Sequence, residues 1–157
     1  MIDHVYYLER GDLVLKPERY DMRGWPAGER EMYAPILQAC YDRGGAFFGA
    51  FESDKLVGAA VLDGRFIGTE RDQLQLAFLH VSHDYRGTGL GRTLFEQAVK
   101  RARELGARQL YISATPSENG IGFYSHLGCE VAGDVDPALF ELEPEDVHMV
   151  YDLRPAA

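Results

Sequence analysis

The sequence lacks the features that mark several common classes of protein. Its 157 residues include only two cysteines, which is too few for the disulfide framework of a small secreted domain. No hydrophobic run approaches the roughly 20 residues that a membrane-spanning helix needs. The N-terminal segment carries early acidic residues and no hydrophobic signal region. These absences predict a cytoplasmic protein that is not associated with a membrane.

Positive charge is also scarce, since the formal net charge is −9. Nucleic-acid-binding proteins usually carry a basic surface that neutralises phosphates, so we expect no nucleic-acid partner. Neither the cysteines nor the five histidines show the spacing of a metal site, such as H-x-x-x-H or H-E-x-x-H. We therefore expect no metal cofactor.

Acidic residues gather in one segment, 130–146, which contains no lysine or arginine. Two interpretations of this segment stay open. It is either a solvated loop that aids solubility or an electrostatic attractor for a cationic amine substrate. The acidic residues concerned are Glu130, Asp134, Asp136, Glu141, Glu143, Glu145 and Asp146.

The most informative segment is 74–92, with the sequence LQLAFLHVSHDYRGTGLGR. An apolar strand leads through a polar turn into RGTGLG and then into a helix expected over 93–105. Glycines allow unusual dihedrals and a close approach of an anion to main-chain N–H groups. The unpaired N–H groups of the first helical turn point to the same place, and two arginines flank the glycines. The segment predicts a diphosphate-binding loop.

Three anion-binding motifs compete for this string. A Walker loop requires Gly-Lys-Ser/Thr, but Gly91 is followed by Arg92 and Thr93. A dinucleotide fingerprint requires a third glycine at position 92, which is arginine. The remaining pattern, R-x-x-G-x-G after an apolar strand, resembles the pyrophosphate loop of the GNAT superfamily of N-acetyltransferases, which bind acetyl-CoA.

A second motif lies about 30 residues further on, in ATPSENGIGFYSHLGCE over 114–130. It resembles the second GNAT signature, in which an asparagine precedes a helix carrying an aromatic–tyrosine pair and a closing Gly-Phe. The pair here is Phe123-Tyr124, and Cys129 stands where phenylalanine is usual. The two motifs together are far more specific than either alone.

The expected elements follow the order of the GNAT architecture. This resemblance implies an α/β (α+β) fold with a mixed, mostly antiparallel sheet, helices on both faces and a splayed parallel strand pair. The length of 157 residues predicts one domain, over 1–153, and we expect the tail over 154–157 to be disordered. We expect strands over 2–8, 46–52, 55–67, 74–81, 109–114, 129–132 and 147–153, helices over 29–41, 93–105 and 119–127, and an irregular or briefly helical stretch over 12–28. Helix 93–105 is expected to bury Leu94, Phe95, Ala98, Ala102 and Leu105.

The resemblance implies roles for individual residues in binding acetyl-CoA. Main-chain groups of Leu79, His80 and Val81 would pair with the pantetheine amides. Asn119 would either bond the pantetheine arm or cap its helix. Tyr124 would lie near the sulfur as a general acid toward the thiolate, or would only pack the core. The diphosphate would be bound by Arg86, Gly87, Thr88, Gly89, Leu90, Gly91 and Arg92.

The general base is not evident from the sequence. The strand position where several GNAT enzymes place a glutamate is Gln75, whose amide cannot accept the proton. His80 has a suitable intrinsic pKa near ~6.5, but strand alternation predicts that it faces away from Gln75. Other ionisable substitutes are Glu70, Asp72 and His83. Deprotonation through water is the leading hypothesis.

The resulting interpretation is an N-acetyltransferase, an acyltransferase that moves an acetyl group from acetyl-CoA to a primary amine by direct attack. The acceptor would be a small cationic amine, an aminoglycoside-like compound or a protein amine. A homodimer is possible, since dimers are common in the family. The alternatives are a non-catalytic acyl-CoA sensor and a nucleotide-binding protein.

Overall fold

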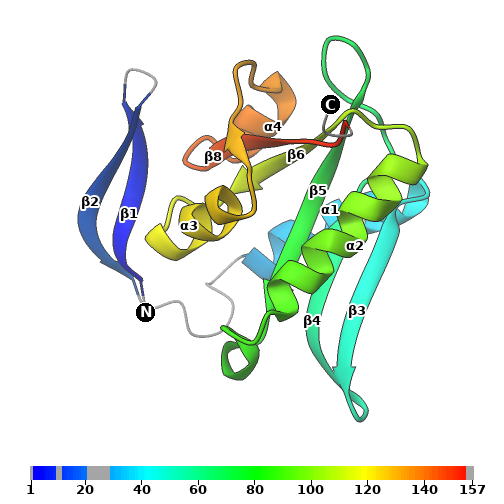
Figure 1. The fold of residues 1–157 in the computed structure, drawn as a ribbon, viewed down its shortest axis with the longest axis horizontal. Helices are drawn as coiled ribbons and strands as arrows, with labels where there is room; N and C mark the ends of the chain where they lie inside the picture. The colour runs from blue at the N-terminus through cyan, green and yellow to red at the C-terminus, as the bar shows by residue number, and fades with distance from the viewer. Residues whose placement is uncertain (1, 10–11, 21–28, 155–157) are drawn as a thin grey trace. The chain divides into compact units, whose positions relative to one another are not determined.

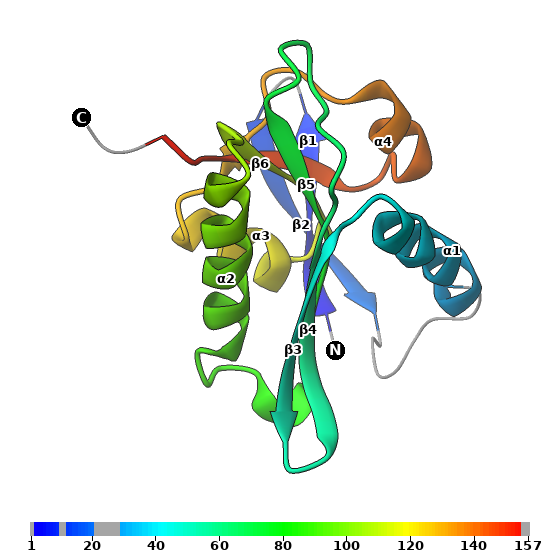
Figure 2. The same cartoon turned by 90° about the vertical axis from the view of Figure 1, so that its right-hand side faces the viewer.

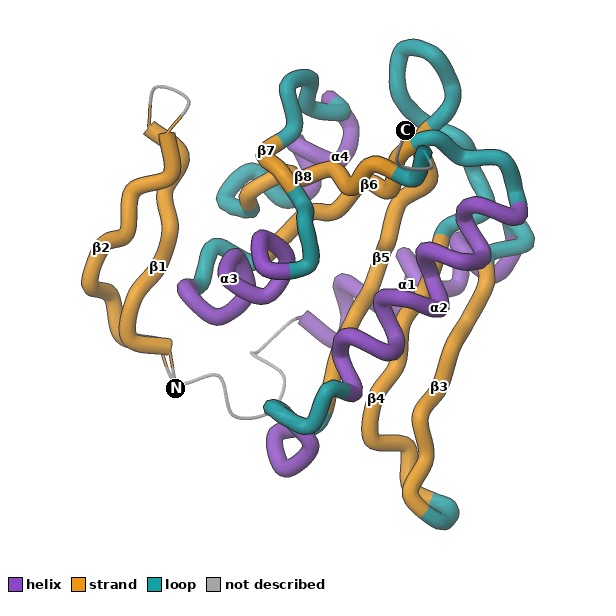
Figure 3. Tube along the Cα trace, viewed as in Figure 1, coloured by secondary structure: helices purple, strands orange, loops and turns teal. Residues whose placement is uncertain are grey.

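The computed structural model describes residues 2–9, 12–20 and 29–154, and side chains from residue 34 to residue 154 (Figure 1). Strands form a two-stranded sheet, β1-β2, and a six-stranded sheet with the order β3-β4-β5-β6-β8-β7. Figure 3 shows these strands and the helices along the chain trace. The mixed α/β class is confirmed. The elements are β1 (Ile2–Glu9), β2 (Asp12–Tyr20), α1 (Glu29–Asp42), β3 (Ala46–Glu52), β4 (Lys55–Leu62), β5 (Gln73–Val81), a 3₁₀ turn (His83–Tyr85), α2 (Leu90–Glu104), β6 (Gln109–Ala114), α3 (Glu118–His126), β7 (Glu130–Val131), α4 (Pro137–Leu142) and β8 (Val147–Asp152).

The chain forms two compact units, which are discontinuous in sequence. One unit comprises residues 34–111 and 152–157, and the other comprises residues 1–33 and 112–151. Within the described residues, no helix combines the length and the apolar character that crossing a membrane requires.

In the first of these units, β3, β4 and β5 form the predicted antiparallel meander. The register pairs Phe48 with Ala60, and Ala60 with Leu79. Helix α2 packs closely on one face, because a Cβ at Gly58 of β4 would lie only 3.0 Å from Leu94 Cδ1. Figure 2 shows α2 and the 34–42 part of α1 on opposite faces of these three strands. The prediction of helices on both faces is confirmed for this part of the sheet.

Helix α2 begins earlier than the sequence suggested. It starts at Leu90 instead of Thr93, because Gly89 in the left-handed region (φ 87°) ends the loop directly before it. Its buried side chains are Leu94, Phe95, Ala98, Val99 and Ala102. The expectation that Leu105 is buried is wrong: this residue follows the last helical turn and is 40% exposed.

Strand β5 contains a β-bulge that the sequence did not reveal. Val61 of β4 pairs with Phe78, but the next residue, Leu62, pairs with Leu76. Ala77 is therefore an extra residue in β5. Such a residue breaks the alternation of side chains between the two faces of a strand.

Strands β5 and β6 begin side by side. The Gln73 side-chain amide donates to Gln109 Oε1 at 2.7 Å, and the Arg108 main-chain N–H donates to the Asp72 carbonyl at 2.8 Å. Since these neighbouring strands start at the same end, they run parallel, as predicted. These contacts fix the start of β5 beside the start of β6.

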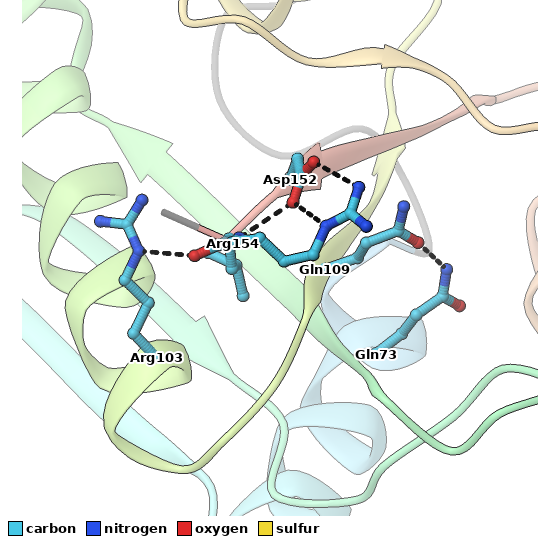
Figure 4. Close-up of polar contacts among 6 residues, drawn as sticks. Gln73, Arg103, Gln109, Asp152 and Arg154 are labelled. Atoms are coloured by element: carbon cyan, nitrogen blue, oxygen red, sulfur yellow. Dashed lines mark hydrogen bonds and ion pairs between the residues drawn. The ribbon is translucent and has the colours of Figure 1, made fainter. Parts of the chain in front are cut away.

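The same end of the unit holds the last residues of the described chain (Figure 4). The Leu153 N–H donates to the Arg108 carbonyl at 2.9 Å, and Arg103 Nε donates to the Leu153 carbonyl at 3.0 Å. Arg154 binds the Asp152 carboxylate through Nε at 3.0 Å and a terminal nitrogen at 2.8 Å. Of the tail predicted to be disordered, residues 155–157 lie outside the described residues.

In the other unit, β1 and β2 form an antiparallel hairpin. The expectation that 12–28 is irregular or helical is wrong for residues 12–20, which form β2. Pro17 suggested a break in structure. However, a two-stranded sheet has outer edges where the missing N–H of proline costs no ladder hydrogen bond. Residues 21–28 lie outside the described residues.

The acidic segment also contains more structure than expected. Helix α4 occupies its middle, and the Asp136 carboxylate caps this helix by accepting from the N–H groups of Ala138 and Leu139 at 3.1 Å each. Pro137 follows at the first helical position, where proline is favoured. Strand β7 pairs antiparallel with β8. The segment is therefore not simply a solvated loop.

Candidate active site

The glycine loop between β5 and α2 depends on two residues with positive φ. Gly87 has φ 76° and Gly89 has φ 87°. In this region a side chain strains the backbone, so glycine is favoured at both positions. A Cβ at either residue would meet no atom of the described chain within 4 Å. The requirement for glycine is thus conformational, and the loop surface above both residues is open.

Hydrogen bonds hold the loop in this shape. The Tyr85 N–H donates to the Ser82 carbonyl at 2.9 Å, and the Thr88 hydroxyl donates to the Tyr85 carbonyl. Arg86 Nε folds back and donates to the Val81 carbonyl at the end of β5 at 3.1 Å. Thr88 and Arg86 thus both fix the turn.

The N-terminus of α2 supplies positive potential at the same loop. The N–H groups of Leu90, Gly91 and Arg92 have no acceptor within the helix. No acidic residue lies in this first turn. Arg92 and Glu96 form an exposed ion pair, 3.2 Å apart. An exposed pair of this kind contributes little to stability. The helix therefore keeps an N-terminus suited to an anion.

Along β5, the main-chain N–H and C=O groups of successive residues point alternately toward β4 and toward the opposite edge of the strand. The Ser82 N–H donates to the Val57 carbonyl of β4 at 2.8 Å. Two residues before Ser82, His80 pairs with Ala59, so its main-chain groups point toward β4 in the same way. In an antiparallel ladder the residues between such pairs direct their N–H and C=O away from the partner strand. Leu79 and Val81, and not His80, therefore present main-chain groups away from β4.

The bulge at Ala77 changes which side chains share a face of β5. Phe78 lies on the face of its partner Val61, and so does His80, whose ring centroid is 6.2 Å from that of Phe78. Leu76 lies on the opposite face with Leu62, so Gln75 returns to the face of His80. The prediction that Gln75 and His80 face opposite ways is wrong.

The surroundings of His80 favour its neutral form. Partial burial and then the positive charge of Arg86 lower the pKa of His80 from its usual value. A neutral imidazole can accept a proton. His80 therefore has the protonation state that a base requires, on the same strand face as Gln75.

Tyr124 and Asn119 belong to α3, in the other unit. The helix is capped by Ser117, whose Oγ accepts from the Gly120 N–H at 3.0 Å, so the interpretation of Asn119 as the cap is wrong. Asn119 is the second helical residue and is exposed. Tyr124 packs edge-on against Phe123, with ring centroids 5.1 Å apart.

Burial reinforces the protonated forms of Tyr124 and Cys129. Burial, followed by the nearby Cys129 and Asp146, raises the pKa of Tyr124 well above its usual value. Burial raises the pKa of the Cys129 thiol to about 12. At neutral pH Tyr124 is thus a phenol that can donate a proton, and Cys129 is a thiol unsuited to nucleophilic attack.

In the sequence, Asp146 is one of seven acidic residues in the segment 130–146, and nothing there distinguishes its role. Burial, and then the neighbouring Glu143 carboxyl, raise the pKa of Asp146 well above its usual range. The Ser113 hydroxyl donates to Asp146 Oδ2 at 3.4 Å. The sequence signal for this environment is its position directly before the predicted strand 147–153, whose first residues, Val147 and His148, are buried in the structure. The acidic segment therefore carries less negative charge at neutral pH than its composition suggests.

The predicted site residues fall into two groups. Leu79 to Val81 and Arg86 to Arg92 form a continuous feature of the unit 34–111, whereas Asn119 and Tyr124 lie on α3 of the other unit. Among the residues whose side chains are described, no group of three or more His, Cys, Asp or Glu is placed to hold a metal ion.

The element order, the mixed sheet and the glycine loop between β5 and α2 define the N-acetyltransferase fold. The model of the acetyltransferase (GNAT) family matches residues 13–129 of this sequence. The chain belongs to the GNAT acetyltransferase family, which confirms the resemblance seen in the two motifs.

Solved structures share this fold at low sequence identity. Nourseothricin acetyltransferase is 21% identical, with a TM-score of 0.66 over 98% of this chain and 86% of that one. PaiA N-acetyltransferase from Thermoplasma acidophilum, in complex with coenzyme A, is 21% identical, with a TM-score of 0.58 over 80% and 71%. An aminoglycoside 6′-N-acetyltransferase complexed with coenzyme A is 16% identical, with a TM-score of 0.62 over 79% and 81%. A comparison with curated proteins gives no match.

Proposed function

We propose that this protein transfers an acetyl group from acetyl-CoA to a primary amine. The observation that carries this proposal is the glycine loop, in which Gly87 and Gly89 adopt positive φ directly before the N-terminus of α2. Open loop geometry and an unopposed helix N-terminus suit a diphosphate. Coenzyme A is present in the PaiA and aminoglycoside 6′-N-acetyltransferase structures that share the fold.

The proposal assigns the two halves of coenzyme A to adjacent parts of the chain. The diphosphate binds main-chain N–H groups of residues 87–92 at the loop and the first turn of α2. The pantetheine amides pair with the main-chain groups of Leu79 and with the N–H of Val81, which point away from β4, while the Val81 carbonyl accepts from Arg86 Nε. Arg86 holds the end of β5 and contributes positive charge beside the diphosphate.

The reaction proposed is direct attack without a covalent enzyme intermediate. The free amine attacks the thioester carbonyl, a C–N bond forms, the C–S bond breaks and the amine loses one proton. Tyr124, which burial keeps protonated, gives a proton to the departing thiolate and regains one from water. The amine proton leaves through water, with His80 as the neutral acceptor on the strand face that also carries Gln75.

The acceptor in this proposal is a small cationic amine, an aminoglycoside-like compound or a protein amine. The fold shared with acetyltransferases named for nourseothricin and aminoglycosides supports a small amine. We further propose that residues 1–153 act as one domain and that the protein forms a homodimer. The family match spans residues from both compact units, which supports the single domain.

A second candidate function is a non-catalytic acyl-CoA sensor. The observation that favours it is Gln75, an amide at the strand position where a carboxylate base is expected. The two functions are separated by incubating the protein with acetyl-CoA and a panel of amines, then measuring released CoA thiol and acetylated products by mass spectrometry. Transfer to any amine supports the enzyme. Tight CoA binding without transfer supports the sensor, and binding of ATP but not CoA contradicts both.

A further inference from the structure

Arg86 joins the two parts of the proposed coenzyme A site. Its side-chain Nε donates to the Val81 carbonyl at 3.1 Å, and its main-chain N–H donates to the His83 carbonyl at 3.2 Å. Val81 is the last residue of β5, and Arg86 directly precedes Gly87, the first glycine of the loop. All of these residues belong to the unit that contains 34–111. The guanidinium group therefore contacts the end of the strand from the loop that follows it.

The Val81 carbonyl is the last acceptor on the edge of β5 that faces away from β4. The Ser82 N–H donates to the Val57 carbonyl of β4 at 2.8 Å, so the main-chain groups of Ser82 point toward β4. In the antiparallel register Val81 lies between Ser82 and His80, and its N–H and C=O point the other way. Arg86 Nε is the donor that this carbonyl meets.

An extended ligand on this edge would use the same carbonyl. A ligand that adds to a strand edge pairs with both the donors and the acceptors of alternate residues. Leu79 presents an N–H and a C=O on this edge, and Val81 presents an N–H. The Val81 carbonyl completes the set, but it accepts from Arg86. Pairing of this carbonyl with a pantetheine N–H therefore competes with the Arg86 contact.

A diphosphate offers Arg86 a stronger acceptor than the carbonyl does. Guanidinium–phosphate pairs join opposite charges and are frequently bidentate, with two parallel N–H···O bonds. The carbonyl gives a single bond to a neutral acceptor. Nε and the adjacent terminal nitrogen form one edge of the planar guanidinium, and this edge can bind two phosphate oxygens only after Nε leaves Val81. The proposed diphosphate site, residues 87–92, begins directly after Arg86.

Little else restrains the Arg86 side chain. Among the residues whose side chains the structure describes, only Val81 accepts a hydrogen bond from it. Arg92, at the other end of the glycine loop, instead forms an ion pair with Glu96 at 3.2 Å. A single hydrogen bond to a carbonyl contributes modestly, so it can be exchanged for another acceptor. Arg86 is thus the arginine of the loop whose position links the strand to the diphosphate.

We propose that Arg86 couples the two halves of coenzyme A binding: it moves from the Val81 carbonyl to the diphosphate and thereby releases this carbonyl for a pantetheine N–H. The inference rests on the proposed function and adds a coupling between the two parts of that site. Hydrogen bonds exchange, and no covalent bond changes. Diphosphate at the loop and pantetheine at β5 then favour each other by the same factor, as linkage requires.

The proposal is tested by calorimetric titration with two fragments of coenzyme A, ADP for the diphosphate and pantetheine for the arm. In the wild type, saturating ADP should lower the Kd of pantetheine roughly fivefold to tenfold, which is a usual size for coupling between two sites. Arg86→Ala should bind pantetheine alone more tightly than the wild type does, because no guanidinium competes for the Val81 carbonyl. In this variant ADP should leave the Kd of pantetheine unchanged.

The matched control is Arg92→Ala, which removes the other arginine of the loop. It should weaken ADP binding but keep the effect of ADP on pantetheine, since Arg92 pairs with Glu96 and not with Val81. Two fragments that bind the wild type without affecting each other overturn this inference and leave the proposed function intact. A wild type that binds neither the fragments nor intact CoA overturns both.

A structure determined with intact CoA covers two further cases, in which the fragments bind too weakly to measure or Arg86→Ala does not fold. The Arg86 guanidinium should contact diphosphate oxygens, and a pantetheine N–H should donate to the Val81 carbonyl. Arg86 Nε that stays on the Val81 carbonyl while CoA is bound overturns the proposal. An Arg86→Ala variant that binds pantetheine no more tightly than the wild type also overturns it.

Discussion

Gln75 and His80 lie on the same face of β5, although they are five positions apart, a spacing that puts residues of a regular strand on opposite faces. The bulge at Ala77 reverses the alternation between them, as the pairs Val61 with Phe78 and Leu62 with Leu76 show. The amide that replaces the expected carboxylate therefore has an imidazole on its own side of the sheet. This relationship makes His80 a better candidate for a proton acceptor than the sequence indicated.

We expect His80→Ala to lower kcat by roughly tenfold to a hundredfold, because a positioned base contributes on the order of 10²-fold or more and water replaces part of it. The acid limb of the wild-type pH profile should lie below ~6.5, because burial and Arg86 lower the pKa of His80. The exposed His83 of the neighbouring turn provides the control variant, His83→Ala. Identical pH profiles for the wild type and His80→Ala would exclude this role.

Tyr124→Phe should lower kcat more than it raises KM, because the phenol acts in the transition state. Since burial raises the pKa of Tyr124, wild-type activity should not decline through loss of this proton below about pH 10. Steady-state kinetics with acetyl-CoA and an accepted amine measure both effects. Phe123→Leu alters the adjacent ring without removing a hydroxyl and should change kcat less. Unchanged turnover in Tyr124→Phe would reduce Tyr124 to a packing residue.

The ion pair between Arg43 and Asp63 should support the fold. Two guanidinium nitrogens bind the buried Asp63 carboxylate at 3.0 Å and 2.6 Å. Asp63→Ala should lower the free energy of unfolding by about 2 to 3 kcal/mol, measured in a urea titration. This loss is smaller than the one expected for a fully buried ion pair, because Arg43 is partly exposed. The control Asp152→Ala, at an exposed ion pair, should leave stability unchanged. Equal effects of the two variants would contradict this assignment.

The Asp63 contribution should also depend on pH. Burial opposes ionisation of Asp63, but the hydrogen bonds and charge of Arg43 prevail and hold its pKa below the usual value. The stability that Asp63 contributes is therefore present above pH ~4, which is the pKa of an aspartate in the unfolded chain. It is lost as the pH falls through the lower pKa that Asp63 has in the folded protein. The difference in stability between the wild type and Asp63→Ala should narrow in this acidic range.

Asp146 should show the opposite dependence. Burial and Glu143 raise the pKa of Asp146. Above pH ~4, where an aspartate of the unfolded chain is ionised, the folded chain therefore binds more protons than the unfolded chain. The stability of the protein should fall as the pH rises. Asp146→Asn removes the ionisation and should raise the free energy of unfolding at pH ~8 by on the order of 1 kcal/mol, with a smaller gain at pH ~5. Urea titrations at both pH values measure the difference. A loss of stability at pH ~8 would show that the carboxylate is instead stabilising.

Features set by local sequence patterns were predictable. Period-two runs gave the meander of β3, β4 and β5, and the apolar spacing of α1 identified a helix despite Pro35. The glycine loop and the Phe123-Tyr124 motif led to the family that the comparison confirms. These signals lie within short segments, so no knowledge of distant contacts was needed.

Features set by pairing or burial were not predictable. The bulge at Ala77 depends on the register with β4, and no residue type marks it. The raised pKa of Asp146 depends on Glu143 and on burial beside β8. The strand β2 was not predicted, because Pro17 suggests a break in secondary structure. Proline fits a strand at the edge of a sheet, and the sequence does not show that β2 lies at one. In each case the deciding factor, the register with a partner strand or burial in the folded chain, is not marked by a local sequence pattern.

The central claim is that the loop between β5 and α2 binds the diphosphate of coenzyme A, and calorimetric titration of CoA into Gly89→Glu tests it most directly. Gly106 provides a matched control, because it also has positive φ (90°) and open space at its Cβ, but at the other end of α2. Gly106→Glu carries the same backbone strain and should bind CoA like the wild type. Gly89→Glu should lose detectable binding while remaining folded. Wild-type affinity in folded Gly89→Glu would contradict the assignment.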